Sequence, residues 1–173
     1  VPMVDTVEQA KTAIAAAKFP PTGNRSVGGG SGAMNFSAEV GDYRLQGNDE
    51  ILVVLQTESP EGIENAEEIY SLPGCDAIFI GPNDLRFQMR EEDGTFPTPE
   101  AHEAAIQEVI QIGKKTGCPT GIHAMDPVSA VQRAEQGMQF IAVESDLKFL
   151  TSQATAALKV VYPDHDAGDV VRY

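Results

Sequence analysis

Short apolar runs alternate with longer helix-like segments along this 173-residue chain. The runs at 51–56, 76–81, 119–124 and 139–143 have the length of strands, and a helix-like segment follows each of them. An unbroken Val/Ile/Leu run such as 51–55 is typical of a strand buried on both faces of a parallel sheet. Strands that alternate with helices predict βαβ units with right-handed crossovers. We therefore predict an α/β fold in which helices cover a parallel sheet.

Helix-start residues precede four of the predicted helices. A capping box is expected at Thr6, and capping residues followed by proline stand at Ser59, Thr98 and Asp126. The predicted helices span about 6–17, 62–72, 98–115, 127–137 and 146–160. The apolar stripe of the last helix is expected to face inward, and it consists of Leu147, Leu150, Ala154, Ala157 and Leu158.

Residues 18–48 interrupt the alternation. They contain Pro20-Pro21 and the glycine-rich run Gly28–Gly32, and no apolar period continues through them. We predict a long loop without regular elements here, and loops of this length inside a compact domain are usually functional.

Composition narrows the class of protein. The length and the apolar fraction of 42% suit a single domain over 1–173, with a polar tail at 163–173. A net charge of -14 argues against nucleic acid as a partner, and no run reaches the roughly 20 apolar residues of a membrane span. Residues 1–4, which read as the end of a strand, do not resemble a signal peptide, so a cytoplasmic location is expected.

Cys75 and Cys118 share no metal-ligand spacing and are predicted to be small buried hydrophobes.

Two carboxylates follow two of the predicted strands. Glu58 follows the run at 51–56 after Thr57, and Asp84 follows the run at 76–81. Carboxyl ends of parallel strands meet at one edge of a sheet, where such folds place their sites. Two carboxylates there suit a divalent cation such as Mg²⁺ or Mn²⁺, although Glu58 alone would also fit a helix cap and Asp84 alone a turn. Gln56 lies two residues before Glu58 and should face the same side.

Several motifs resemble those of the HpcH/HpaI aldolase family of metal-dependent pyruvate aldolases. They are Val1-Pro2-Met3-Val4, Phe19–Gly28, Leu55-Gln56-Thr57-Glu58, Phe79–Leu85 and Ile141-Ala142-Val143. The resemblance covers essentially the whole chain. It implies a TIM-type (β/α)8 barrel, of which this chain supplies about the end of strand 4 through strand 8 and the C-terminal helix. The family's first three strands, which carry its general-base His and an Arg for the pyruvate carboxylate, have no counterpart here.

The resemblance also implies roles for individual residues. Glu58 and Asp84 would be metal ligands for Mg²⁺ or Mn²⁺, with Co²⁺ as a further option. Gln56 and the backbone of Asn83 and Asp84 would contact the oxo acid. The loop at 18–48 would fold over the pocket as a mobile rim, with Arg25 as an anion contact, although a plain flexible loop fits the residues nearly as well.

The roles of two residues near the expected site, His123 and Arg86, are not assigned by the sequence. No catalytic base can be assigned, and His123, which ends a predicted strand, reads either as a replacement base or as a histidine of the rim or core. Arg86 stands where relatives usually have a small serine, so it adds charge beside the pocket.

The activity implied is cleavage or condensation of 4-hydroxy-2-oxo acids, giving pyruvate and an aldehyde. A citrate-lyase-like carbon-carbon lyase is a second possibility. A third is a truncated half-barrel that binds metal and oxo acid, or assembles with partners, without turnover. Because a half-barrel exposes sheet edges and an apolar face, we expect a homo-oligomer.

Overall fold

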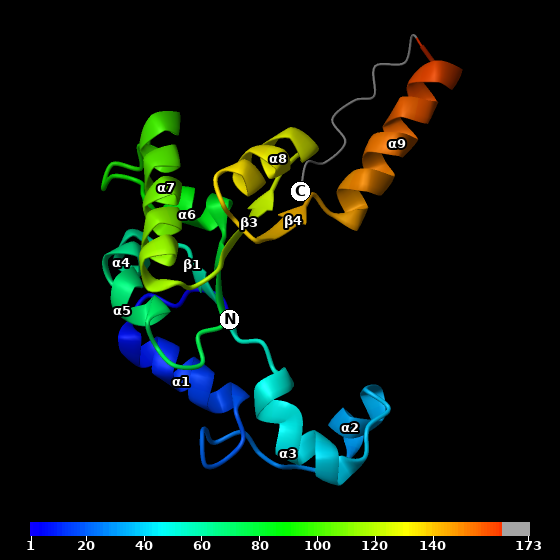
Figure 1. Cartoon of the computed structure of the whole chain (residues 1–173). Helices are drawn as coiled ribbons and strands as arrows, with labels where there is room; N and C mark the ends of the chain where they lie inside the picture. Colours follow the sequence, from blue (N-terminus) through cyan, green and yellow to red (C-terminus); the bar gives the residue numbers. More distant parts are fainter. Residues whose placement is uncertain (164–173) are drawn as a thin grey trace.

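A four-stranded parallel sheet organises the chain. The computed structural model describes residues 1–163, so nearly all of the predicted polar tail at 163–173 lies outside the described residues. The strands are β1 (Val54–Thr57), β2 (Ala77–Ile80), β3 (Thr120–Ala124) and β4 (Phe140–Val143), and they pair in the order β1-β2-β3-β4 (Figure 1). All three pairings are parallel, which confirms the predicted α/β fold. Spatial order follows chain order, as in barrel sheets and unlike doubly wound sheets.

Nine helices are present within residues 1–163. They are α1 (Val7–Ala17), α2 (Ser31–Asn35), α3 (Val40–Glu50), α4 (Pro60–Glu64), α5 (Ala66–Tyr70), α6 (Pro82–Gln88), α7 (Pro99–Thr116), α8 (Pro127–Glu135) and α9 (Asp146–Val161). The predicted caps at Thr6, Ser59, Thr98 and Asp126 each accept a hydrogen bond from a backbone N–H in the first turn. The single helix predicted at 62–72 is instead two short helices that meet at Asn65. None of the described helices combines the length and apolar character needed to cross a membrane.

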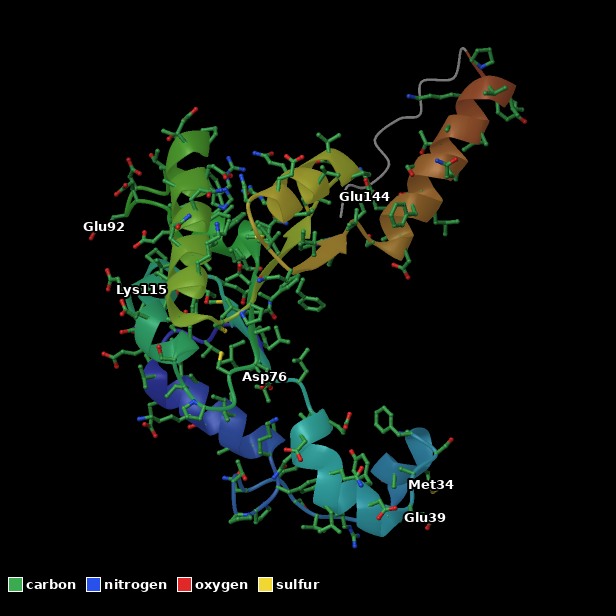
Figure 2. The ribbon with its side chains drawn as sticks, viewed as in Figure 1. Met34, Glu39, Asp76, Glu92, Lys115 and Glu144 are labelled. Atoms are coloured by element: carbon green, nitrogen blue, oxygen red, sulfur yellow. The ribbon has the colours of Figure 1, made fainter. Side chains whose placement is uncertain are left out.

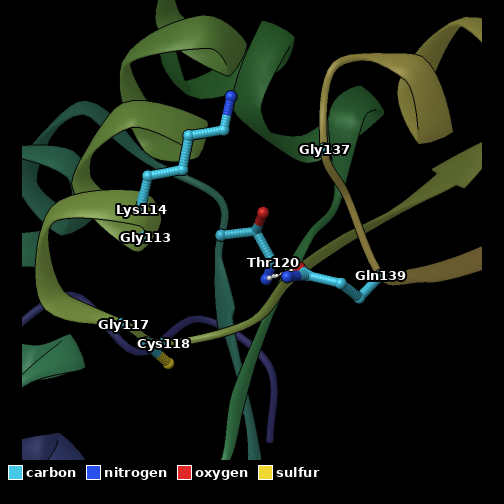
Figure 3. Close-up of a pocket in the computed structure, with 7 residues that line it drawn as sticks. All are labelled: Gly113, Lys114, Gly117, Cys118, Thr120, Gly137 and Gln139. Atoms are coloured by element: carbon cyan, nitrogen blue, oxygen red, sulfur yellow. Dashed lines mark hydrogen bonds between the residues drawn. The ribbon is translucent and has the colours of Figure 1, made fainter.

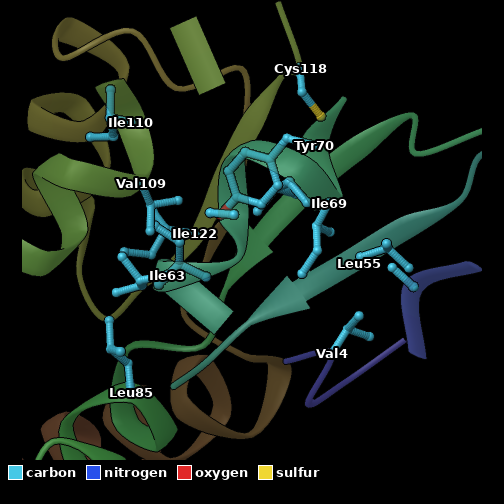
Figure 4. Close-up of a cluster of buried hydrophobic side chains, with 14 of the residues drawn as sticks. Val4, Leu55, Ile63, Ile69, Tyr70, Leu85, Val109, Ile110, Cys118 and Ile122 are labelled. Carbon is cyan, nitrogen blue, oxygen red and sulfur yellow. The ribbon is translucent and has the colours of Figure 1, made fainter. Parts of the chain in front are cut away.

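The two faces of the sheet have different surroundings. Leu55, Ile78 and Ile122 point toward the helices and are at most 2% exposed. They pack in one core with side chains of α5 and α7 that include Ile69 and Val109 (Figure 4). This face carries the main hydrophobic stabilisation of the fold.

The opposite face is only partly covered. In register, Gln56 lies beside Phe79, Phe79 beside Gly121, and Gly121 beside Phe140. The Phe79 and Phe140 rings meet edge to face with 5.5 Å between centroids, yet Phe140 remains 49% exposed. The prediction that the strands are buried on both faces is therefore wrong for the described chain, because helices cover one face only.

Residues 18–48 contain regular structure, so the prediction of a loop without elements is wrong. Helix α3 was not predicted from the sequence because it contains two glycines and few apolar residues. Aromatic contacts take the place of an apolar stripe: the ring of Tyr43 lies 6.3 Å from that of Phe19 and 6.2 Å from that of Phe36, measured between centroids.

A buried ammonium group fixes both ends of this segment beside the start of β1. Lys18 is 6% exposed, and its Nζ donates to the carbonyl oxygens of Asn48 at 2.8 Å and Ile51 at 2.6 Å. The carboxylate of Asp76, labelled in Figure 2, lies 3.7 Å from the same nitrogen and accepts the Val53 N–H at 2.7 Å. Residues 18–48 are thus anchored at the amino-terminal end of the sheet.

Helix α9 extends away from the rest of the molecule (Figure 1). None of its residues is buried, and Leu147, Leu150 and Leu158 are each more than half exposed. The prediction of an inward stripe is therefore wrong within one chain. An amphipathic period shows that a helix face needs a partner, but it does not show that the partner belongs to the same chain.

Candidate functional site

Glu58 is a buried carboxylate at the carboxyl end of β1. It is 3% exposed, its Oε2 accepts the Met3 N–H at 2.9 Å, and its Oε1 accepts the Gln56 Nε2–H at 2.9 Å. Burial raises the pKa of Glu58, and the nearby carboxylates of Asp84 and Asp5 raise this pKa further, while the Met3 hydrogen bond lowers it. The structure therefore holds a carboxylate where its charged form is disfavoured.

Gly81 makes room for this carboxylate. Thr57 pairs with Ile80 in the sheet, so Glu58 and Gly81 lie side by side at the ends of β1 and β2. A Cβ atom added to Gly81 would lie 2.1 Å from Glu58 Oε1. The side chain of Glu58 thus lies directly against the backbone of the neighbouring strand, which only glycine permits.

Asp84 enters the same region from the first turn of α6. This helix begins directly after β2, and the side chain of Asp84 is exposed. Among the described residues it makes no side-chain hydrogen bond, and its negative charge helps to raise the pKa of Glu58. Asn83 precedes it on the same exposed turn, and the helix-capping residue Gly81 offers no side-chain bond to these N–H groups.

Hydrogen bonds join Ser59, the residue after Glu58, to Asp5 and to the first turn of α4. The Ser59 hydroxyl bonds the carboxylate of Asp5 and accepts the Gly62 N–H at 2.9 Å. The Asn65 side chain donates to the Asp5 carbonyl at 2.8 Å. Ser59 is therefore the cap of α4, and the alternative in which Glu58 only caps this helix is wrong.

The carboxylates are suited to a divalent cation. Glu58 and Asp84 form no ion pair with a lysine or arginine within residues 1–163. Each oxygen of Glu58 accepts one hydrogen bond and keeps a second lone pair. No group of three or more His, Cys, Asp and Glu side chains is positioned to hold a metal in the described part of the chain. Two carboxylates would leave further positions to water or substrate oxygens, as Mg²⁺ prefers.

His123 lies on the same edge and on the same face as Gly81. Ile80 pairs with Ile122, so His123 is the next residue in register with Gly81. Its ring is half-buried, and its Nε2 lies 2.9 Å from the carbonyl oxygen of Glu144, which is labelled in Figure 2. Glu144 has a φ of 51°, so this contact fixes an unusual turn between β4 and α9. Whether His123 also acts as a base stays a prediction.

Both predicted arginines contact aromatic rings. Arg25 stacks 4.5 Å from the centroid of Phe19 and donates to the Tyr43 hydroxyl at 3.1 Å, within the segment anchored at the amino-terminal end of β1. The structure does not bring it to Glu58. Arg86 stacks 4.9 Å from the centroid of Phe96, beyond the turn that carries Asp84.

Sequence reasoning missed Met3 and Gly81 as parts of the site. Met3 adopts a left-handed φ of 51°, which aims its N–H at Glu58. The extended residues around it run beside β1, with bonds from Val4 N–H to the Gln56 carbonyl and from Gln56 N–H to the Val1 carbonyl. The glycine of the Gly-Pro pair at 81–82 was visible, but its contact depends on strand register.

A cavity of about 210 Å³ lies elsewhere, at the amino-terminal ends of β3 and β4 (Figure 3). Its walls include Lys114, Thr120 and Gln139, whose Oε1 accepts the Thr120 N–H at 3.2 Å. It contains none of the predicted site residues. The carboxylate site is therefore separate from it.

The fold and the site together define a parallel α/β protein with an acidic centre at the carboxyl ends of adjacent strands. The HpcH/HpaI aldolase/citrate lyase family model matches residues 1–153. The chain belongs to this family.

Proteins similar to this chain include several aldolases. The chain is 38% identical over 156 residues to a hydroxypyruvate/pyruvate aldolase from Chromohalobacter salexigens, covering 89% of this chain and 60% of that protein. It is 40% identical over 147 residues to a 5-keto-4-deoxy-D-glucarate aldolase from Klebsiella pneumoniae, covering 85% and 56%. A solved family member from Burkholderia cenocepacia J2315 superimposes with a TM-score of 0.82 at 33% identity, covering 92% and 63%. The chain thus spans less than two thirds of the length of these relatives.

Proposed function

We propose that this chain supplies the metal-binding and oxo-acid-binding part of a pyruvate-type aldolase. The reaction is reversible cleavage of a 4-hydroxy-2-oxo acid into pyruvate and an aldehyde. The observation that carries the proposal is the buried carboxylate of Glu58 beside Gly81, with Asp84 close by, in a member of an aldolase family. In this proposal the four strands are strands 5 to 8 of a (β/α)8 barrel, and residues 1–4 end strand 4.

Each residue of the site has a distinct task in this proposal. Glu58 and Asp84 hold Mg²⁺ or Mn²⁺, and Gln56 and Met3 fix the Glu58 carboxylate through its two hydrogen bonds. The bound ion supplies Lewis-acid polarisation of the substrate carbonyl. Gln56 uses one amide N–H on Glu58, so its second N–H and its carbonyl oxygen are left to orient the oxo acid. The exposed turn with Asn83 and Asp84 offers backbone N–H groups to the carboxylate of the oxo acid.

A second candidate is binding of metal and oxo acid, or assembly with partners, without turnover. The partly uncovered sheet face with Phe140 favours it, because an exposed apolar surface is suited to a partner. Where the second candidate binds metal, the same carboxylates bind the ion, so only catalysis separates that form from the aldolase. A citrate-lyase-like reaction would use the same centre on another acid.

Pyruvate release tests the proposal directly. We expect release from a 4-hydroxy-2-oxo acid when Mg²⁺ or Mn²⁺ is present, with loss of the activity after chelation and in Glu58→Gln. Metal binding without turnover would support the second candidate instead. Absence of metal binding in the unaltered protein would contradict the aldolase and the metal-binding form of the second candidate, and would leave only assembly with partners.

Self-association is expected through α9. Its exposed leucines would be covered by a second copy of the chain, since an apolar face of this kind is unstable in water. Light scattering should give a mass at least twice that of one chain. Leu150→Glu should reduce that mass to the value for one chain, whereas Ser152→Glu, on the opposite side of the helix, should leave it unchanged. A monomeric unaltered protein would refute the expectation.

A further inference from the structure

Two cysteines occupy equivalent places at the amino-terminal edge of the sheet. Cys75 follows Gly74, which has a φ of +90°, and it lies two residues before β2. Cys118 follows Gly117, which has a φ of +78°, and it lies two residues before β3. Because β2 and β3 are parallel neighbours, these two turns bring the cysteines to the same edge.

The two sulfur atoms are in contact. Their Sγ atoms lie 4.0 Å apart although the residues are 43 positions apart in sequence, and both thiols are free. Cys118 is 8% exposed and belongs to the same hydrophobic core as Tyr70 (Figure 4). Cys75 is only half-buried. The prediction of a buried hydrophobe therefore holds for Cys118 and is wrong for Cys75.

We propose that Cys75 and Cys118 are a redox modification site that closes reversibly into an intramolecular disulfide when the protein meets hydrogen peroxide. A disulfide needs its sulfur atoms at about 2.05 Å, so they must approach by roughly 2 Å. Cys75 lies in a turn outside β2, where a change of side-chain rotamer does not break a strand pairing. Closure of the bond therefore requires the Cys75 side chain to move toward Cys118.

The contact between the two sulfur atoms also shifts the pKa values of the thiols, which sets the order of the oxidation steps. The hydrogen bond between the two thiols lowers the pKa of Cys118 and raises the pKa of Cys75, which favours Cys118 as the thiolate. Cys118 attacks one peroxide oxygen, the O–O bond breaks, and the leaving hydroxide takes up a proton as water. Cys118 is then a sulfenic acid. The Cys75 sulfur attacks it, the S–O bond breaks, and the Cys75 proton leaves with the hydroxide as a second water.

The bond would link the starts of β2 and β3 covalently. It would close the segment that contains α6 and α7, and it would lie at the opposite end of the sheet from Glu58. We therefore expect it to change resistance to unfolding. A cross-link stabilises mainly by restricting the unfolded chain, and the gain rises with the length of the closed loop.

The test starts from fully reduced protein at low concentration, treated with a small excess of hydrogen peroxide and then alkylated. Intact mass should show loss of two hydrogen atoms per chain and no alkylation. Non-reducing peptide mapping should join the peptides that contain Cys75 and Cys118. The unfolding temperature should rise by about 5–10 °C and return after treatment with dithiothreitol.

Three results would overturn the proposal: two alkylated thiols after peroxide treatment, stable addition of oxygen to either sulfur, or disulfides only between chains. Cys75→Ser and Cys118→Ser serve as controls, and each should abolish the rise in unfolding temperature. The mass measurement on the unaltered chain decides the question even if the Cys118 variant, altered at a buried position, fails to fold.

Discussion

Glu58→Gln is expected to weaken Mn²⁺ binding at least about 100-fold, a larger effect than that of altering a group that only supports a ligand. The change keeps the size of the side chain but removes the charge from the most buried carboxylate of the site. Isothermal titration calorimetry on the metal-free protein measures the affinity.

The matched control is Glu61→Gln. Glu61 lies three residues further along, in the exposed first turn of α4, and its removal takes the same charge from the chain. We expect less than about a twofold change in affinity there, since exposed charges are strongly screened. Equal losses in both variants would mean that general charge, not a site at Glu58, attracts the ion.

The metal-free protein gives a second readout of Glu58 through pH. Burial is the main reason that the pKa of Glu58 is raised in the folded state above its ordinary value of 4.5. A raised folded-state pKa contributes stability that is present below the unfolded pKa and is lost as the pH rises through the folded value. The unfolding temperature of the wild type relative to Glu58→Gln should therefore fall as the pH rises above 4.5. A difference independent of pH would contradict this.

Gly81→Ala is expected to weaken metal binding by about 10- to 100-fold without touching a proposed ligand. The added Cβ would lie 2.1 Å from Glu58 Oε1, so the carboxylate must move or β1 and β2 must separate. Gly81 has a φ of -90°, which alanine adopts freely, and the effect therefore reports the clash alone. Calorimetry with Mn²⁺ and thermal unfolding together measure both responses.

Gly41→Ala is the control for this substitution. Nothing lies within 4 Å of the place where its Cβ would stand, and the residue is in α3. Alanine there should stabilise the helix by up to about 1 kcal/mol and leave metal affinity unchanged. If Gly81→Ala binds Mn²⁺ as well as Gly41→Ala does, the packing of Glu58 against Gly81 is irrelevant to the site.

Most of the central fold was predictable because its signals are local. Strand runs, caps such as Ser59 and Thr98, and the stop at Gly117 depend on neighbours within a few residues. Helix α3 was missed because aromatic contacts from outside the helix hold Tyr43. Helix α9 was predicted, but the environment of Leu150 was not, because periodicity carries no information about which chain covers it.

The candidate site was predictable in part for the same reason. Glu58 and Asp84 stand at strand ends, which the sequence shows. The Met3 N–H that bonds Glu58 lies 55 positions away in sequence. Its direction depends on a left-handed backbone conformation, which a methionine does not predict. The contact with Gly81 required the register of two strands, which one sequence does not specify.

The buried ammonium group of Lys18 also brings the two ends of the segment 18–48 together. Phe19 N–H donates to the side chain of Asn48 at 2.6 Å, although the two residues are 29 positions apart. Helices α2 and α3 therefore lie in a segment whose first and last residues are in contact. The start of β1 is therefore tied to both ends of this segment through Lys18, Asn48 and Asp76.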